Sequence, residues 1–187
     1  MAWTIADREF MSRALELAAK GRYTASPNPT VGCVLVRDAS AIGEGYTRPA
    51  GGNHAEIEAL GDLSKAATSG ATAYVTLEPC SHTGKTGPCV DALINAEISR
   101  VVIACEDPNP KVAGQGIKLL EQAGIEVACG LFEDQAREIN RGFIKRHEHG
   151  TPWVLVKMAA SLDGRTAMAS GQSQWITTPA SRKDVQR

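Results

Sequence analysis

Three short segments combine the side chains that a catalytic zinc site requires: His54-Ala-Glu56, Pro79-Cys80 and Pro88-Cys89. Catalytic zinc is held by three protein ligands with one position left for water, and one histidine with two cysteines is an accepted set. Zinc lowers the pKa of a bound water towards about 7. A carboxylate two residues after the histidine can lie beside the metal and carry protons from that water to a leaving group. The pattern therefore predicts zinc-dependent hydrolysis, with Glu56 as general acid and base.

The order of these residues follows the zinc-deaminase signature, in which histidine-x-glutamate precedes proline-cysteine-x-x-cysteine. Here eight residues separate Cys80 from Cys89, so the signature is present with an insertion. A purely structural zinc is the alternative, and it would need a fourth strong ligand. His82 is the candidate for that ligand, because His147 and His149 lie in an expected linker.

The inserted loop, residues 81–87, places an imidazole, a lysine, hydroxyl groups and glycines next to the expected metal. Such donors suit a phosphate or another anion, although an ordinary solvated loop can have the same composition. Asn28, between two prolines, either presents its amide to a substrate or stabilises a turn. Asp107 begins an Asp-Pro-Asn-Pro segment after a strand end, where α/β proteins place ligands, and its spacing favours neither a functional nor a structural role.

Apolar periodicity and turn residues predict the elements that would position these segments. An expected strand runs directly into Pro79-Cys80, and a helix is expected to begin with Pro88 in its first turn. If His54 and Cys89 lie in the first turns of two helices, both helix dipoles favour thiolate and hydroxide at the site. The order of elements implies an α/β sandwich around a mixed sheet. The expected helices are 7–20, 54–60, 88–96 and 114–123, and the expected strands are 31–36, 41–46, 71–77, 101–105, 125–128 and 153–158.

Polar and turn residues cluster at 147–152 and suggest a boundary. We expect one domain over residues 1–147 and a second segment over residues 148–187, which opens with the strand at 153–158 and continues as a polar tail. The remaining cysteines lie within or beside apolar runs and are predicted to be small buried side chains rather than disulfide partners: Cys33, Cys105 and Cys129.

Composition narrows the class of protein. Lysine and arginine number 20 against 21 acidic residues, so the net charge of −1 offers no bulk attraction to nucleic acid. No apolar run approaches the roughly 20 residues that span a bilayer, and no secretion signal is visible at the start of the chain. A cytoplasmic protein with a small-molecule substrate, and with neither a nucleic-acid nor a membrane partner, is expected.

Taken together, the chain closely resembles the bifunctional deaminase/reductase family of riboflavin biosynthesis. The matching stretches are PNPTVGCVLV, HAE, ATAYVTLEPCSHTGKTGPC, EDPNPKVAGQG and KMAASLDGRTAMASGQSQWIT. The resemblance implies a three-layer α/β/α, cytidine-deaminase-like first domain. It also implies hydrolytic deamination of 2,5-diamino-6-(5-phosphoribosylamino)pyrimidin-4-one to the aminouracil, and a possible homodimer.

Residue by residue, the resemblance assigns Zn²⁺ to His54, Cys80 and Cys89, and the proton shuttle to Glu56. It implies that three further residues contact the substrate, with the inserted loop reading its phosphate: Asn28, His82 and Lys85. The chain also departs from the family pattern, with Thr47 where a histidine is usual and Gly52-Asn53 where a glutamate and often a proline are usual. Weaker substrate binding with unchanged metal chemistry is the expected consequence.

The second segment resembles the opening of a dihydrofolate-reductase-like domain that uses NADPH. By resemblance, Ala159 and Trp175 would contact the nicotinamide cofactor and Ser173 the substrate. Residues 151–187 are too few to build a nucleotide-binding domain. NADPH binding and the reductase step are therefore expected only in a chain with the complete domain.

Two other functions fit part of the pattern. One is deamination of a different nucleobase or nucleoside, free or in nucleic acid, although such enzymes usually have the short cysteine spacing. The other is a non-catalytic, zinc-bound partner subunit, which Thr47 and the short second segment would suit.

Overall fold

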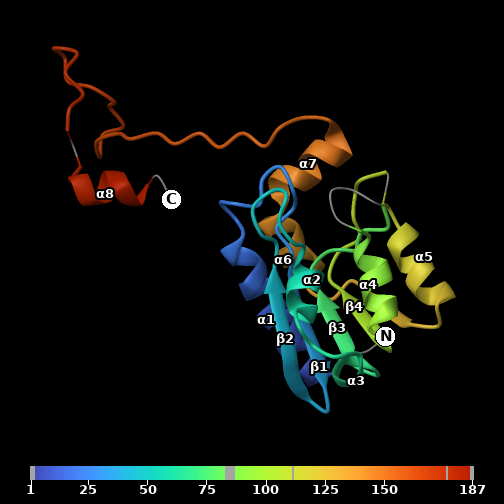
Figure 1. The fold of residues 1–187 in the computed structure, drawn as a ribbon. Coiled ribbons are helices and arrows are strands. Elements are labelled where there is room, and N and C mark those ends of the chain that lie inside the picture. Colours follow the sequence, from blue (N-terminus) through green and yellow to red (C-terminus); the bar gives the residue numbers. More distant parts are fainter. Residues whose placement is uncertain (1–2, 83–86, 111, 176, 186–187) are drawn as a thin grey trace. The chain divides into compact units, whose positions relative to one another are not determined.

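The computed structural model describes residues 3–82, 87–110, 112–175 and 177–185. The chain divides into two compact units, with the division between Trp153 and Val154 (Figure 1). None of the helices in these ranges has the length and apolar composition needed to cross a membrane.

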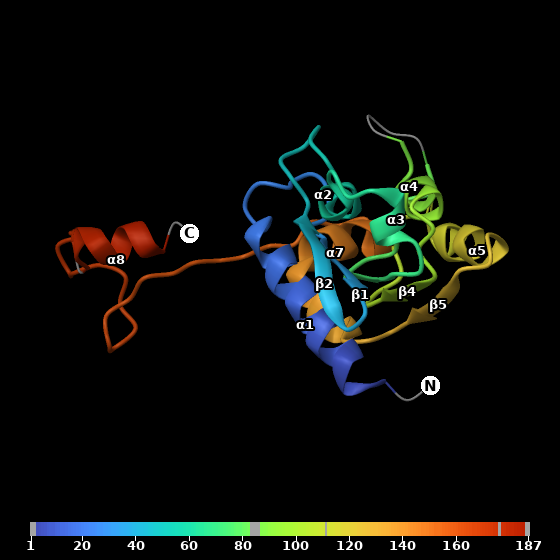
Figure 2. The ribbon, with the colours of Figure 1, turned by 60° about the horizontal axis from the view of Figure 1, so that its bottom comes forward.

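The first unit alternates strands with helices around one sheet (Figures 1 and 2). Its helices are α1 (Ile5–Lys20), α2 (Ala55–Leu60), α3 (Lys65–Thr68), α4 (Cys89–Asn95), α5 (Gln115–Gln122), α6 (Glu133–Ile139) and α7 (Arg141–His149). Its strands are β1 (Gly32–Arg37), β2 (Ser40–Tyr46), β3 (Thr72–Val75), β4 (Arg100–Ile103) and β5 (Glu126–Cys129).

The five strands lie in the order β2-β1-β3-β4-β5. β1 pairs antiparallel with both β2 and β3, whereas β3, β4 and β5 run parallel to one another. The sheet is therefore mixed, as the sequence pattern predicted. The parallel half matters for the site, because the carboxyl ends of β3 and β4 lie at the same edge and release their following loops side by side.

Two glycines show that helices cover both faces of the sheet. A Cβ on Gly32 would collide with the backbone of α1 at Ala14, and one on Gly45 would collide with the backbone of α2 at Ala55. Gly45 pairs with Cys33, the neighbour of Gly32 in β1. Since paired residues share a face and successive residues alternate, α1 and α2 pack on opposite faces. The first unit is a three-layer α/β/α sandwich.

Helix α1 starts at a capping box, in which the Thr4 hydroxyl accepts from the Asp7 backbone N–H and the Asp7 carboxylate accepts from the Thr4 backbone N–H. The same carboxylate also accepts from the Tyr74 hydroxyl of β3 at 3.0 Å and from Arg100 of β4 at 2.6 Å. Asp7 is 2% exposed. One buried carboxylate thus joins the start of the first helix to two central strands.

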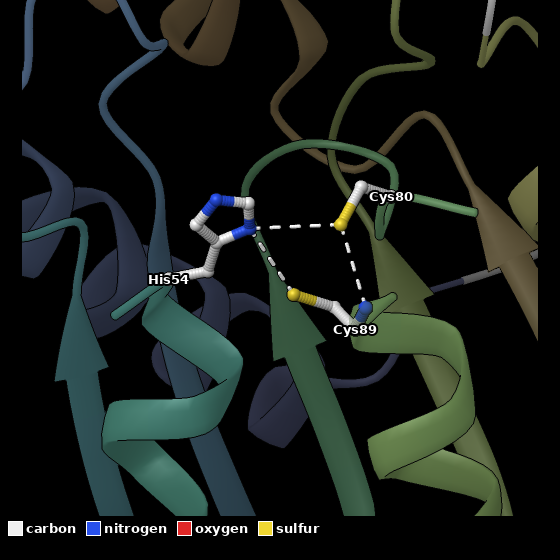
Figure 3. Close-up of side chains that lie close together, drawn as sticks. All are labelled: His54, Cys80 and Cys89. Atoms are coloured by element: carbon white, nitrogen blue, oxygen red, sulfur yellow. Dashed lines mark hydrogen bonds between the residues drawn. The ribbon is translucent and has the colours of Figure 1, made fainter. Parts of the chain in front are cut away.

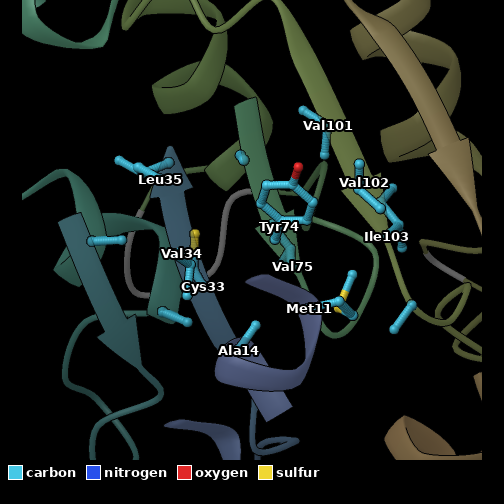
Figure 4. Packing of buried hydrophobic residues seen from close by; sticks show 14 of the residues in the cluster. Met11, Ala14, Cys33, Val34, Leu35, Tyr74, Val75, Val101, Val102 and Ile103 are labelled. Carbon is cyan, nitrogen blue, oxygen red and sulfur yellow. The ribbon is translucent and has the colours of Figure 1, made fainter. Parts of the chain in front are cut away.

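The core includes buried residues of α1, the strands, α2 and α4, and Figure 4 shows part of it around α1 and the central strands. Val34, Leu35, Val75 and Ile103 are fully buried, and β1 is buried along nearly its whole length. Such continuous apolar strands are typical of a sheet with helices on both faces. Cys33 and Cys105 are buried as predicted.

Three expectations about elements and burial were wrong. Cys129 is exposed rather than buried, because it ends β5, which lies at the edge of the sheet. Helices α6 and α7 occupy a region without a predicted element, and the polar cluster interpreted as a linker begins inside α7, which ends at His149. Residues 153–158 form no strand. A strand requires a neighbouring chain for its backbone hydrogen bonds, and this segment pairs with none of the described strands.

Among its described residues, the second unit contains one short helix, α8 (Pro179–Asp184), with Thr178 as its N-cap. Its apolar side chains are largely solvent-exposed, including Val154, Leu155 and Met158. No buried hydrophobic core residue lies in this unit among those described.

Candidate metal centre and pocket

His54, Cys80 and Cys89 converge from three separate parts of the first unit (Figure 3). His54 is the residue immediately before α2, and Cys89 is the first residue of α4. Cys80 lies in the loop that follows β3. The predicted placement of the histidine and the second cysteine at helix starts is confirmed.

The donor atoms have the separations that a tetrahedral zinc ion requires. His54 Nδ1 lies 3.5 Å from Cys80 Sγ and 3.3 Å from Cys89 Sγ, and all three donors lie within 4.8 Å of one another. With zinc–sulfur bonds near 2.3 Å and zinc–nitrogen bonds near 2.0–2.1 Å, tetrahedral geometry places nitrogen and sulfur about 3.5 Å apart. The donor set therefore fits zinc in both chemistry and spacing.

The same cluster bears on the structural-zinc alternative. Among the described residues, no fourth histidine, cysteine or acidic residue joins the three donors. His82 in particular lies outside the cluster. Three protein ligands with one position free is the arrangement of catalytic rather than structural zinc sites.

The two sulfurs differ in their affinity for a proton. The pKa of Cys80 is lowered to about 4, first because the Cys89 thiol donates a hydrogen bond to it and also because His54 does so. Conversely, donation to Cys80 and burial raise the pKa of Cys89. Metal ligands must be deprotonated, so a divalent cation that binds here displaces the proton between the two sulfurs.

Glu56 lies in the first turn of α2 and is 4% exposed. Burial, reinforced by the charge of Cys80, raises the pKa of Glu56 to about 7. A carboxyl group with a pKa near neutrality can both accept and donate a proton at the pH at which it works.

These groups open onto a pocket with a volume of about 420 Å³. The walls include five of the residues that the sequence singled out: Asn28, His54, Glu56, Cys80 and His82. Lys85 lies outside the described residues. Ala159, Ser173 and Trp175 belong to the second unit and are exposed, and their proposed contacts stay predictions.

Several pocket residues were not predicted as site residues from the sequence. Thr47, Glu78, Phe143 and His147 line the pocket together with Asp107 and Asn109. The strand end before Asp107 was a usable signal, and it was left undecided. His147 was assigned to a linker, and only the formation of α7 places it on the pocket wall.

Thr47 illustrates how the chain accommodates its departure from the usual histidine. The Thr47 hydroxyl accepts a hydrogen bond from the Val31 backbone N–H at 2.9 Å, and the residue is 3% exposed. Gly52 also lines the pocket, whereas the Asn53 side chain turns to the Glu58 carboxylate at 2.9 Å. Thr47 therefore lines the pocket while its hydroxyl satisfies the backbone N–H of Val31.

Comparison with known proteins agrees with this geometry. Residues 4–105 match the family described as "Cytidine and deoxycytidylate deaminase zinc-binding region", and residues 152–187 match the "RibD C-terminal domain". The riboflavin biosynthesis protein RibD of Escherichia coli is 57% identical over 180 residues, which are 96% of this chain and 49% of that protein.

Two solved structures are similar over nearly the whole chain. RibD of Acinetobacter baumannii (form 1) is 55% identical with a TM-score of 0.91, and covers 97% of this chain and 51% of its own. The diaminohydroxyphosphoribosylaminopyrimidine deaminase/5-amino-6-(5-phosphoribosylamino)uracil reductase of Thermotoga maritima is 42% identical with a TM-score of 0.89, and covers 97% and 52%. The chain thus spans about half the length of these relatives.

Proposed function

Since this chain belongs to the zinc-binding cytidine and deoxycytidylate deaminase family, we propose that it deaminates 2,5-diamino-6-(5-phosphoribosylamino)pyrimidin-4-one to the corresponding aminouracil in riboflavin biosynthesis. The observation that carries the proposal is the three-donor cluster beside buried Glu56 in one pocket. The substrate class comes from the RibD relatives.

His54, Cys80 and Cys89 would hold the zinc ion. When bound, zinc supplies hydroxide near neutral pH by lowering the pKa of a water molecule to about 7. Glu56 would take up the two protons that the attacking water gives up in turn, delivering one to the ring nitrogen and one to the departing amine, so that the carbon–nitrogen bond breaks and ammonia leaves. Burial raises the pKa of Glu56 to about 7. Since this pKa lies near neutral pH, both accepting and donating a proton cost little free energy.

The rest of the pocket would bind the substrate. Asn28 and His82 line the pocket, and an amide and an imidazole suit the polar edge of a pyrimidinone and a phosphate respectively. Lys85, in the same loop as His82, is proposed as a second phosphate ligand. A homodimer and a cytoplasmic location complete the proposal.

For the second unit we propose the opening of an NADPH-dependent reductase domain, with the deaminase over residues 1–147 and the reductase segment over 148–187. The match of residues 152–187 to the RibD C-terminal domain supports this division. Ala159 and Trp175 would contact the nicotinamide and Ser173 the substrate once the domain is complete.

Ammonia release from the phosphoribosylated diaminopyrimidinone tests the deaminase assignment. We expect Glu56→Gln to lower kcat by about 100-fold or more, because the shuttle is lost, while zinc content stays unchanged. Glu58→Gln is the matched control, since Glu58 lies on the same helix but pairs with Arg48. Faster turnover of cytidine or guanine would redirect the assignment to another base, and bound zinc without any turnover would contradict it.

A further inference from the structure

Glu78 is a buried acidic residue in the pocket wall that the proposed chemistry does not use. It is 3% exposed and lies two residues before Cys80. Its backbone N–H donates to the Cys105 carbonyl oxygen at 2.9 Å, which ties the end of β3 to the end of β4. A carboxylate in this position requires hydrogen-bond donors to offset its desolvation.

Four backbone N–H groups supply those donors, all from the segment that follows β4. Glu78 Oε2 accepts from Asp107 at 3.1 Å and from Gly114 at 3.0 Å. Oε1 accepts from Gly116 at 2.9 Å and from Ile117 at 3.3 Å. Among the described residues, each oxygen therefore has two partners, and all four are backbone N–H groups.

The segment is shaped to reach this carboxylate. Gly114 has a φ of +74°, a left-handed conformation that glycine adopts without strain. Gly116 lies so close to the loop before Cys80 that a Cβ would collide with the Pro79 carbonyl oxygen. Two glycines thus allow the backbone to wrap around one side chain.

The wrapped segment carries part of the pocket wall. Asp107 and Asn109 both line the pocket, and the Asn109 backbone N–H donates to Asp107 Oδ1 at 2.8 Å. The Glu78 carboxylate accepts hydrogen bonds from this segment at Asp107 and again near the start of α5, at Gly114 and Gly116. The residue that precedes Pro79-Cys80 is therefore hydrogen-bonded to a segment that forms part of the pocket wall.

We propose that Glu78 is a positioning residue that sets substrate affinity by holding the Asp107–Asn109 wall at a defined distance from the Cys80 turn. It contributes no proton transfer and no metal ligand. The consequence for substrate binding rests on the proposed deaminase function, whereas the anchoring of the segment does not.

Glu78→Gln tests the proposal with little change in shape. The amide keeps one accepting oxygen but turns an NH₂ group towards two N–H donors, so two of the four hydrogen bonds are lost. We expect KM for the aminopyrimidine to rise about tenfold or more, with kcat within about threefold and zinc content unchanged. Glu126→Gln, an exposed glutamate of β5 that pairs with Arg100, is the control and should leave KM unaltered.

A double-mutant cycle with Asn109→Ala separates positioning from general destabilisation. If Glu78 acts through the wall, its substitution raises KM much less once Asn109 has lost its side chain, and the two effects do not add. Additive effects on KM, a loss of zinc, or a fall in kcat at constant KM would each overturn the proposal.

Amide hydrogen exchange provides a measurement that does not depend on the substrate. In Glu78→Gln we expect faster exchange at Asp107, Gly114, Gly116 and Ile117, with β1 and α1 unchanged. Glu78→Asp serves if the glutamine variant fails to fold, because it keeps both oxygens and shortens the reach by one methylene. Unchanged protection of these amides would refute the anchoring role, whereas absence of turnover in the unsubstituted chain would count only against the proposed deaminase function.

Discussion

At the scale of single residues, the site depends on two sulfurs and one imidazole nitrogen that lie close together. Hydrogen bonds from Cys89 and His54 lower the pKa of Cys80 and so favour its thiolate form. The ligand types and their adjacency to Glu56 could be predicted from the sequence, because the side-chain chemistry is local. Their approach to within hydrogen-bonding distance could not, since 35 residues separate His54 from Cys89.

Cys89→Ala is expected to remove the metal. The substitution leaves one thiolate and one imidazole, and we expect zinc affinity to fall by more than about 100-fold, since even groups that only support ligands are worth 10–100-fold. Zinc content after gel filtration and ammonia release measure the effect. Cys129→Ala is the matched control, because Cys129 is exposed and lies outside the cluster. Retention of stoichiometric zinc by the Cys89 variant would contradict the ligand assignment.

At the scale of elements, Asp7 shows how a helix start is fastened to the sheet. Burial opposes ionisation of this carboxyl, but hydrogen bonds from Arg100, Thr4 and Tyr74 outweigh it and lower its pKa. The helix itself was predictable from apolar periodicity, and its start lay two residues from the predicted one. The link from Asp7 to β3 and β4 was not predictable, because its partners lie 67 and 93 residues away.

Asp7→Asn should destabilise the fold and flatten its acid dependence. The folded-state pKa of Asp7 lies below its unfolded value of about 3.9, so the unfolded state binds more protons as the pH falls. The stability that Asp7 contributes is therefore complete above about pH 4 and declines as the pH drops towards the folded pKa. We expect a loss of about 3 kcal/mol at neutral pH and a smaller further loss on acidification. Urea unfolding at pH 7 and pH 3 measures both.

Loss of an exposed carboxylate that pairs with the same arginine provides the control for that experiment. Glu126→Gln removes a carboxylate that also pairs with Arg100 but is largely exposed, and it should cost less than about 1 kcal/mol. Equal losses from the two substitutions would show that burial of Asp7 adds nothing.

At the scale of the whole molecule, all of the site and all of the described buried core belong to the first unit. The metal ligands, Glu56 and the pocket walls lie before the division at Trp153, and the second unit contains only exposed apolar side chains among those described. The chain spans about half the length of its RibD relatives.

Deletion of residues 154–187 should therefore spare the deaminase. We expect zinc content and ammonia release within about twofold of the full chain, and a change in the free energy of unfolding within about 1 kcal/mol, because the described buried core residues all lie before residue 154. Zinc analysis, turnover and urea unfolding check this expectation. Loss of zinc or of cooperative unfolding would show that the second unit stabilises the first.

The sequence by itself predicted a metal-ligand set, a proton shuttle, the five strands of the sheet and helices α1, α2, α4 and α5, because ligand type, apolar period and turn residues are local properties of the chain. Only the tertiary structure decided that Thr47, Asp107, Asn109 and His147 share one pocket. It also decided that Glu78 faces a segment about 30 residues away. The physical reason is that β3 and β4 pair in parallel and that α7 places Phe143 and His147 at the pocket. The proximity of these residues depends on packing rather than on their spacing along the chain.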